Sequence, residues 1–177
     1  GYAPPTGEVT PRHTAFYARR ARGGVGLLTT EPMFVQENGR ELPSQLGSYA
    51  DHLLPGLQGL VSAVHDAGGR IMAHINHAGR VANPRLVPEG ERVSASEVPC
   101  PANQVTPRSL TRPEIQDVVA AFGQAARRVR EAGFDAMEIP FSHGYLIHQF
   151  LSPHTNRRED EYGGSWENRL RFGREGI

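Results

Sequence analysis

The sequence has little of several features, and each shortage argues against a class of protein. Lys plus Arg and Asp plus Glu both total 19, so the formal net charge is zero, and no basic stripe is interleaved with aromatic residues. This balance argues against nucleic acid as the main partner. No apolar run approaches the ~20 residues that span a bilayer, and the N-terminus lacks a charged-then-apolar signal pattern. We therefore expect no membrane partner.

Cysteine is almost absent as well. The single Cys100 cannot form an internal disulfide, which fits a reducing cytoplasm as the location of the protein. It lies in the segment EVPCPAN, which has the composition of a loop, with no histidine beside it. This context favours an incidental thiol over a reactive nucleophile.

Both ends of the sequence are unusual for a complete protein. It begins with GYAPPTGEVT, which lacks an initiator Met and is turn-like in composition, and it stops at RLRFGREGI inside an expected helix. Its 177 residues suit one domain with a sizeable core. We therefore expect residues 1–177 to be one partial domain of a longer chain.

The same local pattern occurs three times along the chain. A helix-start signal precedes an amphipathic run, glycine ends the run, and an apolar strand follows. Parallel strands covered by helices have this signature. The helical runs begin at Thr10-Pro11, Pro55 and Thr111 and end at Gly23-Gly24, Gly68-Gly69 and Gly133, and the strands are expected within residues 25–31, 70–76 and 134–140.

The third helix carries the clearest signals. Thr111 and Glu114 have the spacing of a capping box, and Pro113 lies in the first turn. No G-x-G-x-x-G motif follows any expected strand, which disfavours a dinucleotide-binding Rossmann unit. The remaining common α/β fold is the (β/α)₈ TIM barrel, which needs about 250 residues. We therefore predict a partial barrel.

Barrel active sites lie at the C-terminal ends of the strands, so the residues there are the candidates for function. These ends carry Glu31-Pro32, then HINHAGR (residues 74–80), then His143-Gly144-Tyr145. We expect Pro32, His74 and Tyr145 to share one rim. Residues 81–110, rich in proline and polar residues, are expected to form a long loop over it.

The residues at these positions resemble a known family. FDAMEIPFSHGYLIHQFLSPHTNRREDEYGGSWENRLRF resembles the signature of the Old Yellow Enzyme family of flavin-dependent ene reductases, and HINHAGR and ARGGVGLLTTEP resemble two of its strand regions. The similarity runs from about residue 7 to residue 172. The wording MAHINHAGRVANP is most similar to the branch of bacterial 2,4-dienoyl-CoA reductases.

The resemblance implies an FMN-binding (β/α)₈ barrel, of which this chain holds roughly the second to fourth strand units. It also implies NADH or NADPH as reductant and a small-molecule substrate with an activated C=C bond, either an α,β-unsaturated carbonyl or a dienoyl thioester. The flavin phosphate cradle falls outside the sequence. In the reductase branch, an iron–sulfur cluster and an FAD domain follow in the missing C-terminal part, and an oligomer is possible.

Two catalytic residues follow from the resemblance. Tyr145 matches the tyrosine that protonates the substrate α-carbon after hydride transfer, and a phenol with a pKa of ~10 keeps its proton for that step. His143 matches a residue that hydrogen-bonds the substrate carbonyl, where each donor is worth ~10²–10³ in rate. Both residues also have structural interpretations, as a tyrosine packed under its loop and a histidine holding that loop together.

Cofactor contacts are expected from two further residues. Pro32 matches a small residue whose backbone approaches the flavin, and it could also simply end a strand. His74 stands where most of the family has glutamine. A neutral imidazole can donate or accept one bond at a time, whereas the glutamine amide can do both. Pro140 departs from the family too, because many members have a second histidine there. Asn76 shares a strand face with His74 and is expected to look into the barrel.

Two alternative functions remain open at this stage. A metal-dependent barrel hydrolase is conceivable because catalytic zinc uses histidines, and five lie in one part of the chain: His74, His77, His143, His148 and His154. The strand spacing separates the first two, and no H-E-x-x-H motif is present. A catalytically inert or binding-only fragment is the other alternative. We interpret Arg157, Arg158, Asp160 and Tyr162 as scaffold, with Ser165 capping a following helix.

Overall fold

The computed structural model describes residues 1–176, which divide into two compact units. Each unit is assembled from segments that are distant in the sequence. The first unit contains Gly1–Val35, Leu42–Ile75 and Gln124–Ile139, and the second contains Gln36–Glu41, Asn76–Gly123 and the segment from Pro140 onward. Helix α3 and strand β3 run from one unit into the other.

The three expected helix–strand pairs lie wholly or in part in the first unit. Their bounds are α1 Pro11–Arg22 with β1 Leu27–Thr29, α2 Leu54–Asp66 with β3 Arg70–Asn76, and α3 Arg112–Ala132 with β6 Ala136–Glu138. The short elements β2 Met33–Phe34 and η2 Asp51–Leu53, a 3-10 helix, complete it. The pairs confirm the predicted alternation, and the expected strand 70–76 is reproduced over its whole length.

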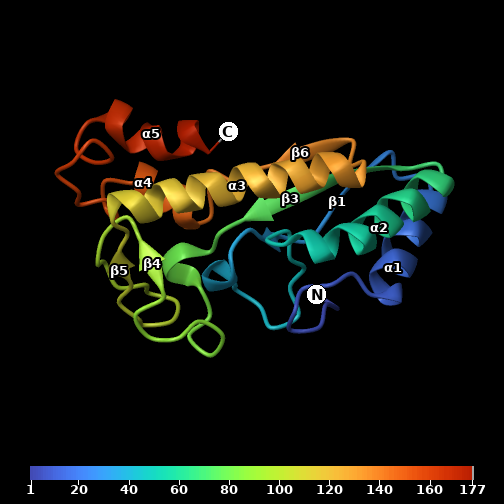
Figure 1. The fold of residues 1–177 in the computed structure, drawn as a ribbon, viewed down its shortest axis with the longest axis horizontal. Coiled ribbons are helices and arrows are strands. Elements are labelled where there is room, and N and C mark those ends of the chain that lie inside the picture. Colours follow the sequence, from blue (N-terminus) through green and yellow to red (C-terminus); the bar gives the residue numbers. More distant parts are fainter. Residues whose placement is uncertain (177) are drawn as a thin grey trace. The chain divides into compact units, whose positions relative to one another are not determined.

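These strands form a parallel sheet with β3 at its centre (Figure 1). Strand β3 pairs with β1 in the register Leu27↔Arg70 and with β6 in the register Met72↔Ala136, and β2 joins the same sheet. The parallel order of β1, β3 and β6 follows from the helical crossovers, since each of these three strands is reached through a helix. Prediction of an α/β fold with parallel strands is thus confirmed within this unit.

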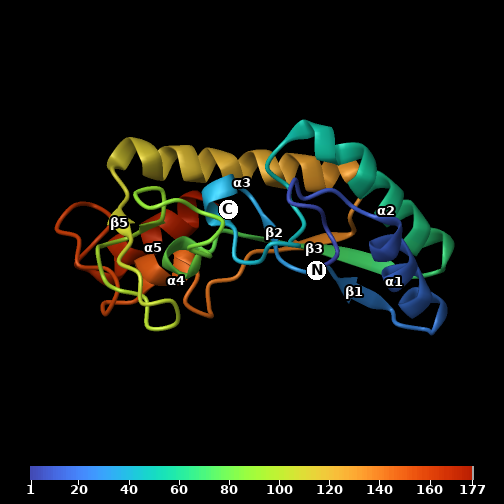
Figure 2. The ribbon, with the colours of Figure 1, turned by 90° about the horizontal axis from the view of Figure 1, so that it is seen from below.

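The helices cover one face of this sheet (Figure 2). In β3 the residues Ile71, Ala73 and Ile75 are fully buried, whereas Arg70, on the alternate face, is exposed. The core between α1, α2 and the sheet consists of Tyr17, Ala21, Leu28, Leu60, Val61, Val64 and Ile71. Leu27, the Cα partner of Arg70, is 51% exposed, so the face away from the helices bears uncovered apolar surface at this position.

The second unit contains the remaining elements. They are the 3-10 helices η1 Glu37–Gly39 and η3 Gly79–Val81, strands β4 Val93–Ser94 and β5 Arg108–Ser109, and helices α4 Leu146–Leu151 and α5 Trp166–Glu175. Strands β4 and β5 pair in parallel, with Val93 opposite Arg108. The prediction that residues 81–110 form a long loop is confirmed for most of the segment, but it missed these two short strands. Two-residue strands carry too little periodicity to be seen in a sequence.

Local capping signals are confirmed in both long helices of this region. The Glu114 carboxylate accepts the Thr111 N–H at 2.8 Å, and the Thr111 hydroxyl accepts the Glu114 N–H at 3.4 Å, which completes the capping box at the start of α3. Ser165 caps α5 by accepting the Asn168 N–H at 3.2 Å. Arg108 adds a bidentate pair that lowers the pKa of Glu114 to about 2.

Polar side chains in the segment after α4 hold the surrounding backbone in place, as expected of scaffold residues. Arg158 donates to the carbonyls of Ala95 and Leu110 and forms a two-pronged pair with Asp160. Asn156 donates to the Phe150 carbonyl and to a second carbonyl, that of Tyr162, both at 2.7 Å. These bonds satisfy carbonyls that have no partner in regular secondary structure, as buried backbone requires.

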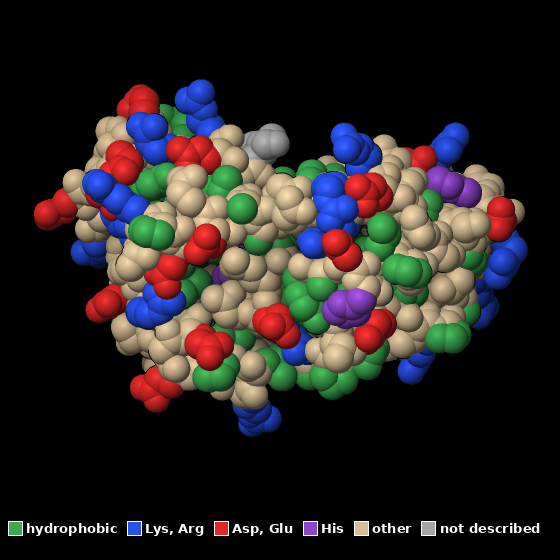
Figure 3. Space-filling model, viewed as in Figure 1, with side chains coloured by type: hydrophobic (Ala, Val, Ile, Leu, Met, Phe, Trp, Pro, Cys, Tyr) green, Lys and Arg blue, Asp and Glu red, His purple; other side chains and the backbone are tan. Residues whose placement is uncertain are grey.

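The charged surface has no dominant sign on the face that Figure 3 presents. Blue Arg side chains lie interspersed with red Asp and Glu side chains there, in line with the equal totals of 19 basic and 19 acidic residues. Among residues 1–176, no helix combines the length and apolar character required to cross a bilayer.

Candidate active site

A strained turn presents the first pair of candidate residues. His143 has φ 60° and Gly144 has φ 76°, so two successive residues adopt the left-handed region. A non-glycine residue there costs free energy and persists only where the surroundings enforce it. The His143 side chain is exposed, and its Nδ1 lies 2.7 Å from the Ser142 hydroxyl. Within residues 1–176, the sequence neighbour Ser142 occupies Nδ1, and Nε2 is the second ring nitrogen that can form a hydrogen bond.

Tyr145 follows this turn as the N-cap residue of helix α4. Its ring packs against a small apolar cluster, which consists of Ala78, Ala82 and Val87. Its hydroxyl donates to the Glu41 carboxylate at 2.9 Å. Burial and, second, this carboxylate raise the pKa of Tyr145 to about 12. The phenol therefore keeps its proton throughout the neutral range.

Glu41 belongs to the short segment Gln36–Glu41, and the His77 side chain holds this segment in place. The His77 ring is fully buried and lies 3.1 Å from the Asn38 side-chain oxygen through Nε2, while Nδ1 accepts the Gly79 N–H at 3.0 Å. These two contacts define the neutral tautomer with the proton on Nε2. Burial lowers the pKa of His77 to about 4. The Gly39 backbone lies against the same ring and leaves no room for a side chain.

The turn itself is fixed by Gln149 and His148 of helix α4. The Gln149 amide donates to the carbonyls of Gly144 at 2.6 Å and Ala78 at 3.1 Å, and its oxygen accepts the Arg80 N–H at 3.1 Å. His148 accepts the Gly144 N–H through Nδ1 at 2.9 Å. These bonds supply the constraint that the left-handed turn requires, so His143 and Tyr145 are presented in one defined geometry.

His74 and Pro32 belong to the first unit. The His74 N–H donates to the Thr30 hydroxyl at 2.9 Å, and its ring Nδ1 lies 3.5 Å from Glu138 on the neighbouring strand β6. The side chain of His74 is 16% exposed and that of Glu138 is 44% exposed. The ring therefore stands on the sheet face that the helices leave uncovered, beside a carboxylate.

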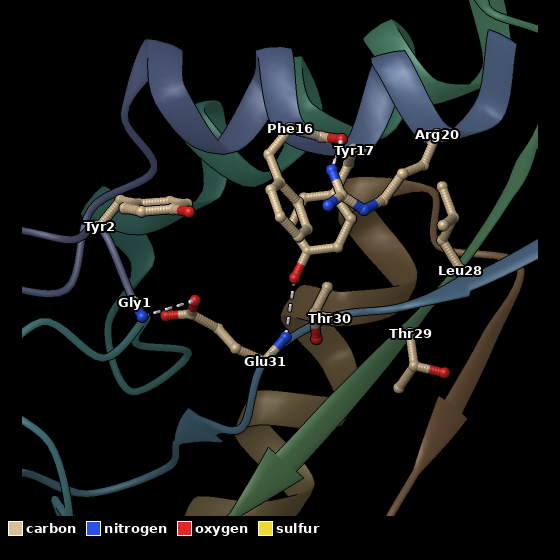
Figure 4. A pocket seen from close by; sticks show the side chains of 9 residues that line it. All are labelled: Gly1, Tyr2, Phe16, Tyr17, Arg20, Leu28, Thr29, Thr30 and Glu31. Atoms are coloured by element: carbon tan, nitrogen blue, oxygen red, sulfur yellow. Dashed lines mark hydrogen bonds and ion pairs between the residues drawn. The ribbon is translucent and has the colours of Figure 1, made fainter. Parts of the chain in front are cut away.

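The backbone that leads into Pro32 is fixed from helix α1. The Glu31 N–H donates to the Tyr17 hydroxyl at 2.9 Å, as the dashed line in Figure 4 shows. The Glu31 carboxylate accepts the Leu46 N–H at 3.1 Å. A cavity of about 420 Å³ lies beside this strand end, lined by residues of α1 and β1. The backbone just before Pro32, which lies between β1 and β2, is thus tied to α1.

The structure brings His143 and Tyr145 together on one turn and places His74 and Pro32 at strand ends of the other unit. The common rim stays a prediction. Glu41 was missed from the sequence because it lies 104 positions from Tyr145, and no local pattern marks it. Pro140 is buried, and Asn76 is 2% exposed with an amide nitrogen that no atom of the described residues accepts.

The histidines that suggested a metal site have other contacts. His74 lies by Glu138, His77 is bonded on both ring nitrogens, and His148 accepts a backbone N–H. Across residues 1–176, no three or more His, Cys, Asp or Glu side chains are grouped so that they could hold a metal ion.

Comparison with known proteins shows similarity over nearly the whole chain. The model of a family described as "NADH:flavin oxidoreductase / NADH oxidase family" matches residues 3–177. An NADPH dehydrogenase of Listeria monocytogenes is 47% identical over 166 residues, which are 94% of this chain and 48% of the relative. The chain thus spans about half the length of the curated relatives it matches.

Two solved structures share the fold of the chain. An old yellow enzyme homologue from Zymomonas mobilis is 30% identical with a TM-score of 0.91, covering 99% of this chain and 51% of that one. A 2-naphthoyl-CoA reductase in complex with 2-naphthoyl-CoA is 30% identical with a TM-score of 0.92, covering 99% of this chain and 28% of that one.

Proposed function

Because the chain belongs to the NADH:flavin oxidoreductase / NADH oxidase family, we propose that the protein is an FMN-dependent oxidoreductase that reduces activated C=C bonds with NADH or NADPH. The resemblance to Old Yellow Enzymes noted in the sequence is confirmed by the family match and the structural similarities. The observation that carries the proposal is the Tyr145 phenol, held protonated beside His143 on a rigid turn.

The residues present fit a flavin. Asn76 contributes a buried amide donor that no described residue uses, and a flavin offers carbonyl acceptors at its pyrimidine edge. We propose that His74 contacts that edge and that the backbone at Pro32 lies against the ring system. Bound FMN would supply hydride drawn from the nicotinamide. Residues 1–177 then form part of one FMN-binding barrel and supply its second to fourth strand units.

The two catalytic residues have different proposed roles. His143 donates to the substrate carbonyl oxygen, which polarises the C=C bond conjugated to it and stabilises the charge that develops there. Tyr145 gives its phenolic proton to the α-carbon of the substrate. Both groups stand on a turn that Gln149 and His148 brace, so little reorganisation is needed at the moment of reaction.

The substrate class can be narrowed within this proposal. Pro140 offers no donor where a second histidine would grip a small enone. A larger conjugated thioester is supported by the likeness to the 2-naphthoyl-CoA reductase, whose structure holds a CoA thioester. We propose a dienoyl or comparable unsaturated thioester as the substrate. An iron–sulfur cluster and FAD in the remainder of the protein belong to the same proposal.

The test compares the two half-reactions of the full-length enzyme by stopped flow. Tyr145→Phe should slow reoxidation by an enone or dienoyl thioester by ~10²–10⁴, while flavin reduction by NADH or NADPH keeps its rate. His143→Ala should weaken substrate binding and slow hydride transfer together. Tyr162→Phe is the matched control, because Tyr162 also donates to a glutamate, Glu175 at 2.8 Å, but belongs to the scaffold. Unchanged alkene reduction in Tyr145→Phe would refute the assignment.

A further inference from the structure

The Tyr145 hydroxyl has a charged partner that no local sequence motif announces. It donates to Glu41 at 2.9 Å, although the two residues are 104 positions apart. Hydrogen bonds to an ionised acceptor are roughly twice as strong as neutral ones. The half-buried setting strengthens this bond further, because water screens it less there. The direction of the phenolic O–H is thus set by Glu41.

Both partners are held by the same stretch of backbone. The Arg40 carbonyl, next to Glu41, accepts the Asn83 N–H at 2.9 Å, and the Gly39 carbonyl accepts the Ala78 N–H at 3.0 Å. On the other side, the Leu146 N–H, next to Tyr145, donates to the His77 carbonyl at 3.0 Å. Residues 77–83 therefore fix the distance between the carboxylate and the phenol, and the contact is not a chance meeting of two surface side chains.

We propose that Glu41 is a positioning residue that holds the phenolic proton of Tyr145 in place and sets how readily the phenol releases it. This inference rests on the proposed function, because it takes Tyr145 to be the acid. During turnover the O–H turns from Glu41 to the substrate α-carbon. The O–H bond breaks, a C–H bond forms, and the electron pair stays on the phenolate oxygen until a proton from water restores it.

The charge of Glu41 opposes that release. A phenolate formed beside a carboxylate is destabilised, as is any like-charged pair. Replacing Glu41 by neutral glutamine should therefore make the phenol a stronger acid. We expect the pKa of Tyr145 to fall by about one unit, a tenfold rise in its acid dissociation constant. The rate of alkene protonation should rise ~3-fold, because in a Brønsted relation the rate constant changes by less than the acid dissociation constant does.

The experiment titrates the phenol directly in the full-length protein. Tyrosine is labelled with ¹³C at Cζ, and the Tyr145→Phe variant identifies the Tyr145 resonance by its loss. In the wild type this resonance should stay in its protonated position up to about pH 11, given the raised pKa of Tyr145. In Glu41→Gln it should begin to shift about one pH unit lower. Glu41→Asp, which keeps the charge, should retain most of the elevated pKa.

Two controls separate this role from a structural one. Glu37→Gln removes an exposed carboxylate from the same segment, and Glu175→Gln removes the partner of Tyr162. Neither should move the Tyr145 resonance. An unchanged Tyr145 titration in Glu41→Gln would overturn the proposal, as would an alkene step slowed as strongly as in Tyr145→Phe. A full-length protein without bound flavin would instead refute the proposed function, while the titration would still decide whether Glu41 controls the phenol.

Discussion

The burial of the His77 ring leads to a quantitative prediction about how the stability of the protein changes at low pH. The ring is neutral in the folded protein because burial lowers its pKa to about 4, against 6.5 for an exposed histidine. A histidine with a depressed folded pKa contributes stability above its unfolded pKa and loses it as the pH falls through the folded value. The window is therefore pH 6.5 down to about 4. The loss amounts to roughly 3 kcal/mol, at 1.36 kcal/mol per pKa unit.

The mechanism of this loss is visible in the contacts of the ring. In the neutral ring, Nδ1 accepts the Gly79 N–H. Protonation puts a hydrogen on Nδ1, so this hydrogen bond is replaced by a repulsive contact between two donors. The variant His77→Gln keeps an acceptor and a donor of similar reach but cannot titrate. It should be less stable than the wild type at pH 7.5 and lose roughly 3 kcal/mol less between pH 6.5 and 4.

Urea denaturation of the full-length protein at several pH values measures this difference. His154→Gln serves as control because His154 is exposed, and it should follow the wild-type pH dependence. Nitrogen NMR of His77 gives an independent check on the tautomer, with the proton on Nε2. Equal pH dependence in the wild type and His77→Gln would refute the reasoning, and so would a His77 ring that titrates near pH 6.5.

Three further predictions concern the bonds that hold the scaffold and the turn. Glu114→Gln should lower the free energy of unfolding by ~1 kcal/mol at pH 7, because it weakens the α3 cap. The pKa of Glu114 lies at about 2 instead of 4.5. The urea midpoints of the variant and the wild type should therefore converge as the pH falls through this range. Asn156→Ala should cost ~2 kcal/mol in thermal or urea unfolding, because it strands two buried carbonyls. Gly79→Ala should cost ~1–3 kcal/mol and slow alkene reduction, since Gly79 has φ 58° and its Cβ would displace Gln149.

Much of the fold follows from signals that are local in the sequence. The helix starting at Pro11, the cap formed by Thr111 and Glu114, and the strand 70–76 were all predicted and are all present. These features depend on residues within a few positions of one another, so propensity, capping and apolar periodicity suffice to indicate them. The turn from His143 to Tyr145 was likewise indicated by its position after an apolar strand and by the family resemblance.

Only the tertiary structure decided what surrounds those residues. The pair formed by Tyr145 and Glu41 joins positions 104 apart, and the tautomer of His77 depends on Asn38 from another segment. The parallel strands β4 and β5 also form across a long separation, from two residues each. Such contacts are selected by the packing of the whole chain, because each buried polar group must find a partner wherever the fold brings one. The sequence by itself therefore determined which groups are offered for chemistry, and the folded chain determined their proton positions and acidity.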